Sequence, residues 1–215
     1  MDGSGEGDGN GIVIGTPGDG NDAANQPNSL LLAAAQNGDA AGVRAALDAG
    51  ADINATFIDG SNAIFWAALG GHEEVFDLLL ETGADAANAN SEGVTVLHHL
   101  ASNGMAARIR AVVADGRAGE NLSPGDEEGA TPLHFAAAED RVDAVEALIA
   151  AGAGLEATTD EGMTPLFLAV MMGQAGAAKV LLDAGANPDA ANEDGETPRS
   201  MAEEPELIEL MGSTA

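Results

Sequence analysis

A short phrase returns along this chain at a nearly constant interval, and it constrains the fold more than any other feature. In the stretch "DEEGATPLHFAAAEDRVDAVEALIAAGAG", from Asp126 to Gly154, a turn leads into T-P-L-H, two helical patterns and a closing glycine. The same interval of 33 residues separates these pairs of turn glycines: Gly60 and Gly93, Gly129 and Gly162, and Gly162 and Gly195. A period of this length is typical of arrays in which each unit contacts only its neighbours. The sequence therefore predicts a stack of helix pairs.

Each part of the phrase predicts where a helix begins or ends. Thr131 stands where an N-cap oxygen accepts from free backbone N–H groups, and Pro132 stands at the first helical position, where a missing N–H is harmless. Gly71 lets the chain reverse between the two helices of a unit, and Gly83 falls where a left-handed cap ends the second helix. Small residues such as Ala136 on the first helix let neighbouring helices approach closely.

With these motifs and this period, the sequence resembles the ankyrin-repeat family over residues 29–215. Five full copies and a partial closing one begin at Ser29, Asn62, Thr95, Thr131, Thr164 and Thr197. The resemblance implies an all-α solenoid of stacked antiparallel helix pairs, joined by β-turn or hairpin loops. An apolar composition of 45% with only 3% aromatic residues agrees with thin layers of close-packed helices.

The third copy departs from the pattern in two ways. It has Val96 where proline is expected, and Gly116 is separated from Gly129 by 13 residues, against 10 between Gly50 and Gly60. We expect the extra residues to bulge at the turn edge as a tolerated insertion. Three of the seven cations also fall in this copy: Arg108, Arg110 and Arg117. We favour pairing of these arginines with nearby acids such as Glu73, Glu74 or Glu81 over a role in anchoring an acidic partner.

The first 28 residues differ in composition from the rest. They contain eight Gly and five acids, and Ile12–Ile14 is an apolar island within them. Such a segment buries too little apolar surface to offset its ordering entropy, so we expect a flexible tail over residues 1–28. The run also weakly resembles Gly/Asp calcium-binding nonapeptides, whose candidate ligands would be Asp8, Asn10, Asp19 and Asp22. Another interpretation is that Ile12–Ile14 covers the exposed end of the first helix pair.

The charge of the chain excludes some classes of partner. Its 7 Lys and Arg against 36 Asp and Glu give a formal net charge of -29, which repels phosphate backbones and anionic lipids. We therefore expect neither nucleic-acid nor membrane binding. The acidity indicates either adaptation to high salt or an acidic binding face. The N-terminus lacks the pattern of a secretory signal, so we expect a soluble, cytoplasmic chain.

No catalytic or metal-binding motif is evident. The run "HEEVF" from His72 has Phe76 where the second histidine of a zinc-protease helix must stand, and the chain has no cysteine. Neighbouring helical residues such as His98 and His99 point in directions that cannot converge on one metal. The family resemblance instead implies that His98 and His134 brace the turns. We expect no enzyme activity, no metal and no cofactor.

The resemblance also implies where a partner docks: in a concave groove formed by the turn tips and the first helices. The groove residues that match the family positions include Ile58, Asp59, Leu69, Glu92, Glu127, Glu128, Glu139, Asp160, Glu161, Met171 and Met172. We expect a noncatalytic scaffold that binds a protein with a basic patch, and we expect Trp66 to fill the core. The alternative is an acidic inhibitor or immunity protein that blocks the basic site of a toxin or nuclease.

Overall fold

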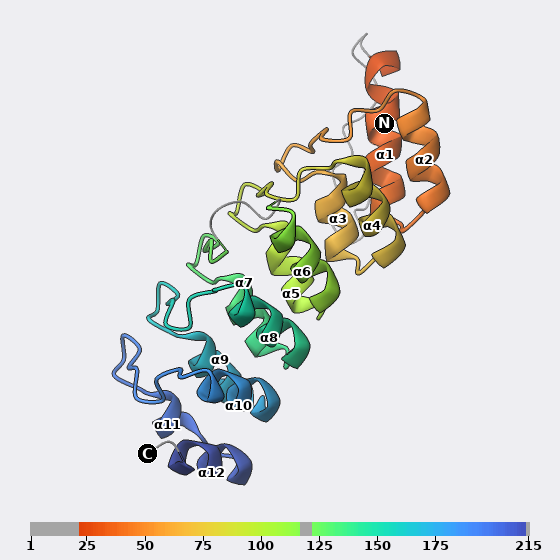
Figure 1. Ribbon diagram of the computed structural model, residues 1–215. Coiled ribbons are helices and arrows are strands. Elements are labelled where there is room, and N and C mark those ends of the chain that lie inside the picture. The colour runs from red at the N-terminus through yellow and green to blue at the C-terminus, as the bar shows by residue number, and fades with distance from the viewer. Residues whose placement is uncertain (1–21, 117–121, 214–215) are drawn as a thin grey trace, which may run out of the picture.

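The computed structural model describes residues 22–116 and 122–213, which form six pairs of antiparallel helices stacked side by side (Figure 1). The first helices of the pairs are α1 (Asp22–Gln36), α3 (Ala63–Leu69), α5 (Val96–Ser102), α7 (Pro132–Ala138), α9 (Pro165–Met171) and α11 (Pro198–Met201). The second helices are α2 (Ala40–Asp48), α4 (Glu73–Thr82), α6 (Ala106–Ala114), α8 (Val142–Ala150), α10 (Ala175–Asp183) and α12 (Pro205–Ser213). The predicted all-α repeat fold is confirmed.

The first helix begins earlier than the sequence predicts. Helix α1 starts at Asp22, inside the segment that we assigned to the tail, and it contains Pro27. Ala23 and Ala24 are strong helix formers. The prediction of a tail relied on the glycine-rich composition of residues 1–28 as a whole and did not consider the helix preference of this alanine pair.

Side-chain caps fix the start of the first helices. Thr164 Oγ1 accepts from the backbone N–H of Phe167 at 3.2 Å, and Asn62 Oδ1 accepts from Phe65 at 3.1 Å. The absence of proline at Val96 does not delay α5, since Thr95 and His98 form a reciprocal capping box there. Each cap satisfies a backbone group that the first helical turn leaves free.

Left-handed residues reverse the chain where the sequence predicts them. Gly71 has φ 66° between α3 and α4, and Gly83 has φ 102° after α4. In the fourth pair the reversal is made by Asp140, with φ 51°, the only described non-glycine residue with positive φ. Its Oδ1 accepts from the N–H of Ala177 at 2.6 Å in the next pair, which gives this residue a role that glycine lacks.

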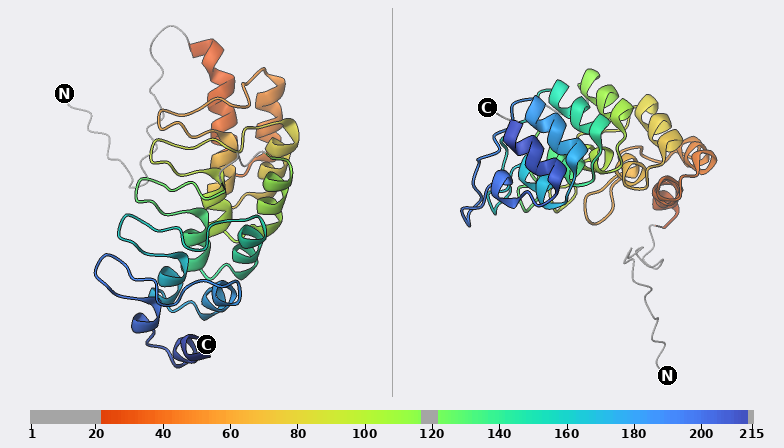
Figure 2. Two further views of the ribbon diagram at one scale, coloured as in Figure 1. Left: turned by 60° about the vertical axis from the view of Figure 1, so that its left-hand side comes forward. Right: turned by 90° about the horizontal axis from the view of Figure 1, so that it is seen from below.

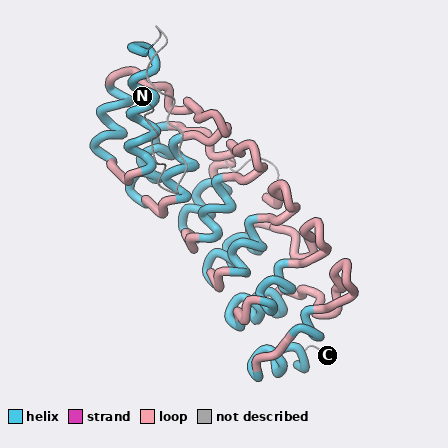
Figure 3. The backbone as a smooth tube through the Cα atoms, turned by 180° about the vertical axis from the view of Figure 1, so that it is seen from behind, coloured by secondary structure: helices cyan, strands magenta, loops and turns pink. Residues whose placement is uncertain are grey.

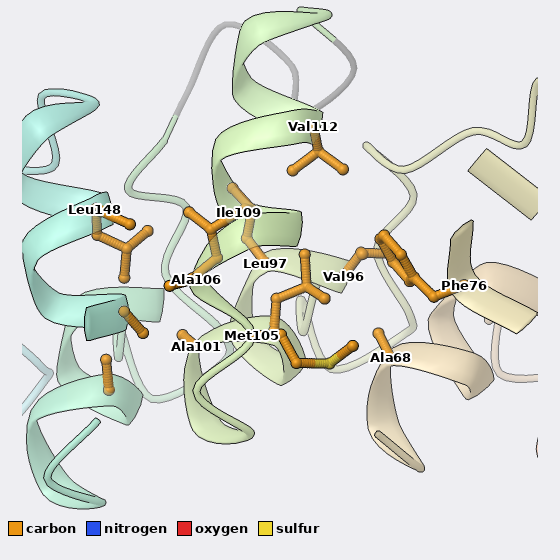
Figure 4. Packing of buried hydrophobic residues seen from close by; sticks show 14 of the residues in the cluster. Ala68, Phe76, Val96, Leu97, Ala101, Met105, Ala106, Ile109, Val112 and Leu148 are labelled. Carbon is orange, nitrogen blue, oxygen red and sulfur yellow. The ribbon is translucent and has the colours of Figure 1, made fainter. Parts of the chain in front are cut away.

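The core is a continuous row of small and branched side chains between successive pairs. Figure 4 shows this packing around α5 and α6, where Leu97 and Ile109 lie between Phe76 of the preceding pair and Leu148 of the following one. These four residues are at most 1% exposed. Each pair thus covers the apolar side of its neighbour, as expected for a solenoid.

The connections between pairs project from one side of the stack (Figure 3). The stack is curved, with the second helices on its outer side (Figure 2). Successive first helices contact one another from α1 through α11. The inner face is therefore built from first helices and from the hairpins that connect the pairs.

Candidate functional site

The hairpins of the inner face share one backbone design. The first N–H of each hairpin donates to the carbonyl four residues later, at 2.8 to 3.0 Å, in the pairs Phe57–Ser61, Asn90–Val94, Asp126–Ala130, Thr159–Met163 and Asn192–Glu196. In three of them the Asn or Asp side chain at the first position also accepts from N–H groups two and four residues later. In these three hairpins, the bonds that close the loop do not involve the side chains at the tip. In the hairpin before α3, Asp59 Oδ1 at the tip accepts instead from the backbone N–H and the hydroxyl of Ser61, at 3.0 and 2.7 Å.

A ladder of backbone hydrogen bonds joins the tips of successive hairpins. Its four bonds run from Ser91 N to Asp59 O, Glu127 N to Glu92 O, Asp160 N to Glu128 O and Glu193 N to Glu161 O, at 2.6 to 3.0 Å. Most of the residues in this ladder are acidic, and Glu92, Glu127, Glu128, Asp160 and Glu161 are exposed. The backbone bonds hold these like charges in a row although the carboxylates repel one another.

Two histidines each connect the start of their own helix to the hairpin that leads into the next helix pair. His98 Nδ1 accepts from the N–H of Thr95 at 2.9 Å, which places the ring proton on Nε2, and Nε2 donates to Ala130 O at 3.0 Å. His134 makes the equivalent bonds to Thr131 at 3.0 Å and to Met163 O at 3.0 Å. Burial lowers the pKa of both rings, so the neutral imidazole is the form that this geometry holds.

A hollow of about 390 Å³ lies on the inner face beside α7. It is lined by Ser102, Ala130, His134, Phe135, Ala138, Glu139 and Leu168. These residues belong to first helices, to the C-cap of α7 at Glu139 or to the hairpin root at Ala130. Phe135 and Leu168 are half-buried, so the floor of the hollow is apolar while exposed Glu139 lies at its edge. Such a mixture of apolar floor and charged edge suits a protein-binding surface.

An aromatic group lies on the same face at α3. Phe57, at the base of the hairpin that precedes α3, packs edge-to-face on Trp66 with ring centroids 5.6 Å apart. The indole N–H of Trp66 donates to Ser61 Oγ at 2.8 Å, and Trp66 packs half-buried against the core as expected. Phe57 occupies the position where three other hairpins have Asn or Asp and one has Thr159, so the base of this hairpin is apolar. Its side-chain cap comes from Asp59 at the tip.

Comparison with known families decides what kind of array this is. A model of ankyrin repeats in three copies matches residues 30–118 and 117–192, which is more than half of the chain. The chain belongs to the ankyrin-repeat family. The ankyrin repeat is generally a noncatalytic module that supports protein–protein interaction.

The ankyrin groove positions predicted from the sequence fall into two groups. Ile58 is 93% exposed at its hairpin tip, beside half-buried Asp59 and in line with the exposed acids of the ladder. Leu69, Met171 and Met172 are 41%, 46% and 54% exposed at the C-terminal ends of α3 and α9. The α7 hollow extends between these two groups, since it is lined both by Ala130 at a hairpin root and by Glu139 at a helix end.

Of the residues that line the α7 hollow, Glu139 was among the predicted groove positions, but neither the hollow itself nor the ladder of the ankyrin hairpins was predicted. Leu168 was not among the predicted groove residues, because its position within T-P-L-F-L reads as core. The ladder consists of backbone bonds between repeats, which side-chain identity does not encode. The signal that could have found the hollow is Phe135, a large side chain at a position where Ala33 stands in the first repeat.

Other side chains tie the second to fifth ankyrin repeats each to the preceding one, on the side opposite the hairpins. His72 Nε2 bonds Gln36 O at 2.9 Å, Arg141 Nε donates to Ser102 O at 2.7 Å, and Gln174 Nε2 donates to Ala138 O at 2.8 Å. In the third repeat Met105 stands at this position, and Asn103 Nδ2 donates to Ala68 O at 2.8 Å instead. The histidine bonds at the hairpins and these bonds at the opposite ends of the first helices therefore connect repeats along both edges of the groove.

The outer face of the ankyrin stack also bears charges. Arg108 on α6 bonds Asp77 on α4 with Nη2–Oδ2 at 2.6 Å, and its Nη1 lies 3.0 Å from Glu73. The predicted intramolecular pairing is thus confirmed for Arg108. Arg117, and part of the insertion that we expected to bulge, lie outside the described residues.

The described residues contain no group of three or more His, Asp or Glu side chains placed to hold a metal ion. Of the candidate calcium ligands, Asp8, Asn10 and Asp19 lie outside the described residues, while Asp22 begins α1. None of the described helices is both long enough and apolar enough to cross a lipid bilayer.

Proposed function

We propose that this chain is a noncatalytic scaffold that binds a partner protein through the inner face of its ankyrin stack. The partner carries a basic patch, which meets the acidic hairpin tips, and an apolar segment, which contacts Ile58 or the α7 hollow. The observation that carries this proposal is the tip-to-tip ladder, since it holds a row of acids in fixed register beside an apolar floor.

The two kinds of surface have different tasks in this proposal. Carboxylates at the tips attract a basic partner over several ångströms and raise the association rate. Exposed apolar side chains such as Ile58 and Met172 lose contact with water in the complex, which slows dissociation. Methionine adapts its shape to the partner because its side chain is unbranched and flexible.

The shape of the inner face favours binding over catalysis. The α7 hollow is open along one side of the stack, and catalytic sites generally gain from enclosure that excludes water. His99 has a pKa lowered to about 4, and its Nε2 is buried without a hydrogen-bond partner. This atom is therefore not available to a substrate at the surface. A scaffold without catalytic activity accounts for these features.

The distribution of charge bears on the alternative of an acidic inhibitor of a toxin or nuclease. Exposed acids lie at the hairpin tips, but Glu74, Glu81, Asp143 and Glu146 are also exposed on second helices. Acids confined to the groove would favour an inhibitor, and their presence on both faces favours a general solvating role for part of the charge. We therefore retain the scaffold as the proposed function.

Site-specific photocrosslinking in the native lysate tests the proposal. A photoreactive phenylalanine at Leu69 or Met172 should capture the same partner, because both positions lie on the inner face. The matched control carries the photoreactive residue at Glu146 on α8, which is exposed on a second helix. Capture at Glu146 with none at Leu69 or Met172 would refute binding through the inner face. A captured nuclease or toxin would instead establish the inhibitor.

A further inference from the structure

The terminal helix pairs at the two ends of the stack differ in how their outer surfaces are covered. At the C-terminal end, α12 covers α10 with Leu207 and Met211, which are 0% and 2% exposed, while Glu206 and Glu209 of the same helix are exposed. At the N-terminal end, α1 and α2 contact α3 and α4 on one side only. End units of a solenoid need a polar outer surface to remain soluble. The C-terminal end has these exposed acids, with Ile208 of α12 53% exposed among them.

The N-terminal end instead presents an apolar hollow of about 360 Å³ between α1 and α2. It is lined by residues that include Leu30, Ala33, Asn37, Gly42, Ala45 and Ala46. Leu30 is 55% exposed. Ala63 and Val96, which stand 33 and 66 positions further along the chain, are 0% exposed because the preceding pair covers them. The hollow is thus the surface that a preceding unit would bury.

We propose that Ile12–Ile14 of this same chain docks in the hollow and acts as the N-terminal cap of the stack. Ahead of α1, Ile12–Ile14 is the only run of consecutive large apolar residues, and it is surrounded by glycine and acids. It therefore supplies the apolar side chains that match the hollow, and its acidic flanks give the covered end a polar outer surface.

The length of the chain permits this contact. Residues 15–21 join the island to α1, and seven residues span at most about 23 Å when extended. Leu30 lies eight residues beyond Asp22 along α1, which is about 12 Å of helix. The segment can therefore fold back along α1 and reach the hollow. A second copy of the chain is the competing occupant.

Two engineered cysteines test the docking, since the chain has none of its own. Gly15→Cys leaves the island intact, and Ala45→Cys places a thiol in the hollow. Under mild oxidation in the full chain, we expect an intrachain disulfide to form at least about tenfold faster than in the Gly15→Cys, Arg44→Cys control. Arg44 is adjacent in sequence and exposed, but it pairs with Glu74 of the next repeat. Equal rates for the two pairs would overturn the proposal, and so would a disulfide that forms mainly between chains.

Hydrogen exchange provides a second measurement without cysteines. In the full chain with Ile12, Val13 and Ile14 all changed to Ser, amides of α1 and α2 should exchange on the order of tenfold faster. Amides of α9 and α10 should not change, since each repeat depends on its neighbours. Unchanged exchange in α1 and α2 would also overturn the proposal.

Discussion

The backbone N–H of Asp160 donates a 2.8 Å hydrogen bond to the carbonyl oxygen of Glu128, which joins two acidic hairpin tips of adjacent repeats. The equivalent bond from Glu127 to Glu92 measures 2.9 Å. Because these bonds use backbone atoms, they hold the hairpin tips in register without engaging the carboxylates. A basic partner therefore meets an ordered row of negative charge and does not have to organise it on binding.

The bridge from His134 to the next hairpin should be important for stability. In the His134→Leu variant, the carbonyl of Met163 and the N–H of Thr131 lose their imidazole partners while remaining in a poorly solvated region. We expect unfolding in urea to show a loss of about 2 to 3 kcal/mol. Hydrogen exchange should locate the opening at residues 159–163. A loss below about 0.5 kcal/mol would show that the bridge is dispensable.

His99 should make the fold sensitive to acid. Burial, followed by the charge of His98, lowers the pKa of His99 to about 4 from its ordinary 6.5. The unfolded chain therefore binds the proton first, and the contribution of the neutral ring is complete above pH 6.5 and falls as the pH drops towards 4. At pH 5 the contribution has decreased by on the order of 2 kcal/mol.

The His99→Leu variant isolates this effect from the many carboxylates. Leucine stands at the equivalent position of the fifth repeat, at Leu168, and it removes the unpartnered Nε2. Urea unfolding gives the difference in the free energy of unfolding between the variant and the natural chain. This difference should shift in favour of the variant by about 2 kcal/mol when the pH is lowered from 7.5 to 5. Parallel pH profiles for the two proteins would contradict the assignment. The edge-to-face contact of His99 with Phe65, at 4.6 Å, is lost at both pH values and does not alter the comparison.

Much of this fold was predictable from the sequence because the repeat encodes its own boundaries. Thr131, Pro132 and Gly83 each have a local conformational preference, and the structure places each one where that preference predicts. Trp66 was correctly expected to pack against the core. In the third repeat, the capping box of Thr95 and His98 compensates for the missing proline.

The remaining features depend on contacts between repeats, which local patterns do not encode. The α7 hollow is lined by Ser102 of one repeat and by Ala138 and half-buried Phe135 of the next. The early start of α1 at Asp22 reflects a short alanine pair within a glycine-rich segment. The partner-binding roles of the predicted groove residues remain predictions.

Ile58 should contribute to partner binding without contributing to stability. It is 93% exposed at a hairpin tip, so Ile58→Ser removes almost no buried contact within the chain. We expect an unchanged melting temperature and an affinity for the crosslinked partner weaker by about tenfold, measured by calorimetry. Ile208→Ser is the matched control, because Ile208 is 53% exposed on α12 outside the groove. An equal loss of affinity in both variants would argue against a specific contact at Ile58.

The association rate of the captured partner, measured by stopped flow at low salt, tests the central claim most directly. One variant neutralises tip acids as Glu127→Gln, Glu128→Gln, Asp160→Asn and Glu161→Gln. The control neutralises the same number of exposed acids on second helices as Asp48→Asn, Glu81→Gln, Asp143→Asn and Glu146→Gln. If the tips steer the partner, the first variant should associate at least about tenfold more slowly and lose most of its salt dependence, while the control stays within about threefold of the natural chain. Equal slowing in both variants, or no slowing in either, would contradict binding at the acidic inner face.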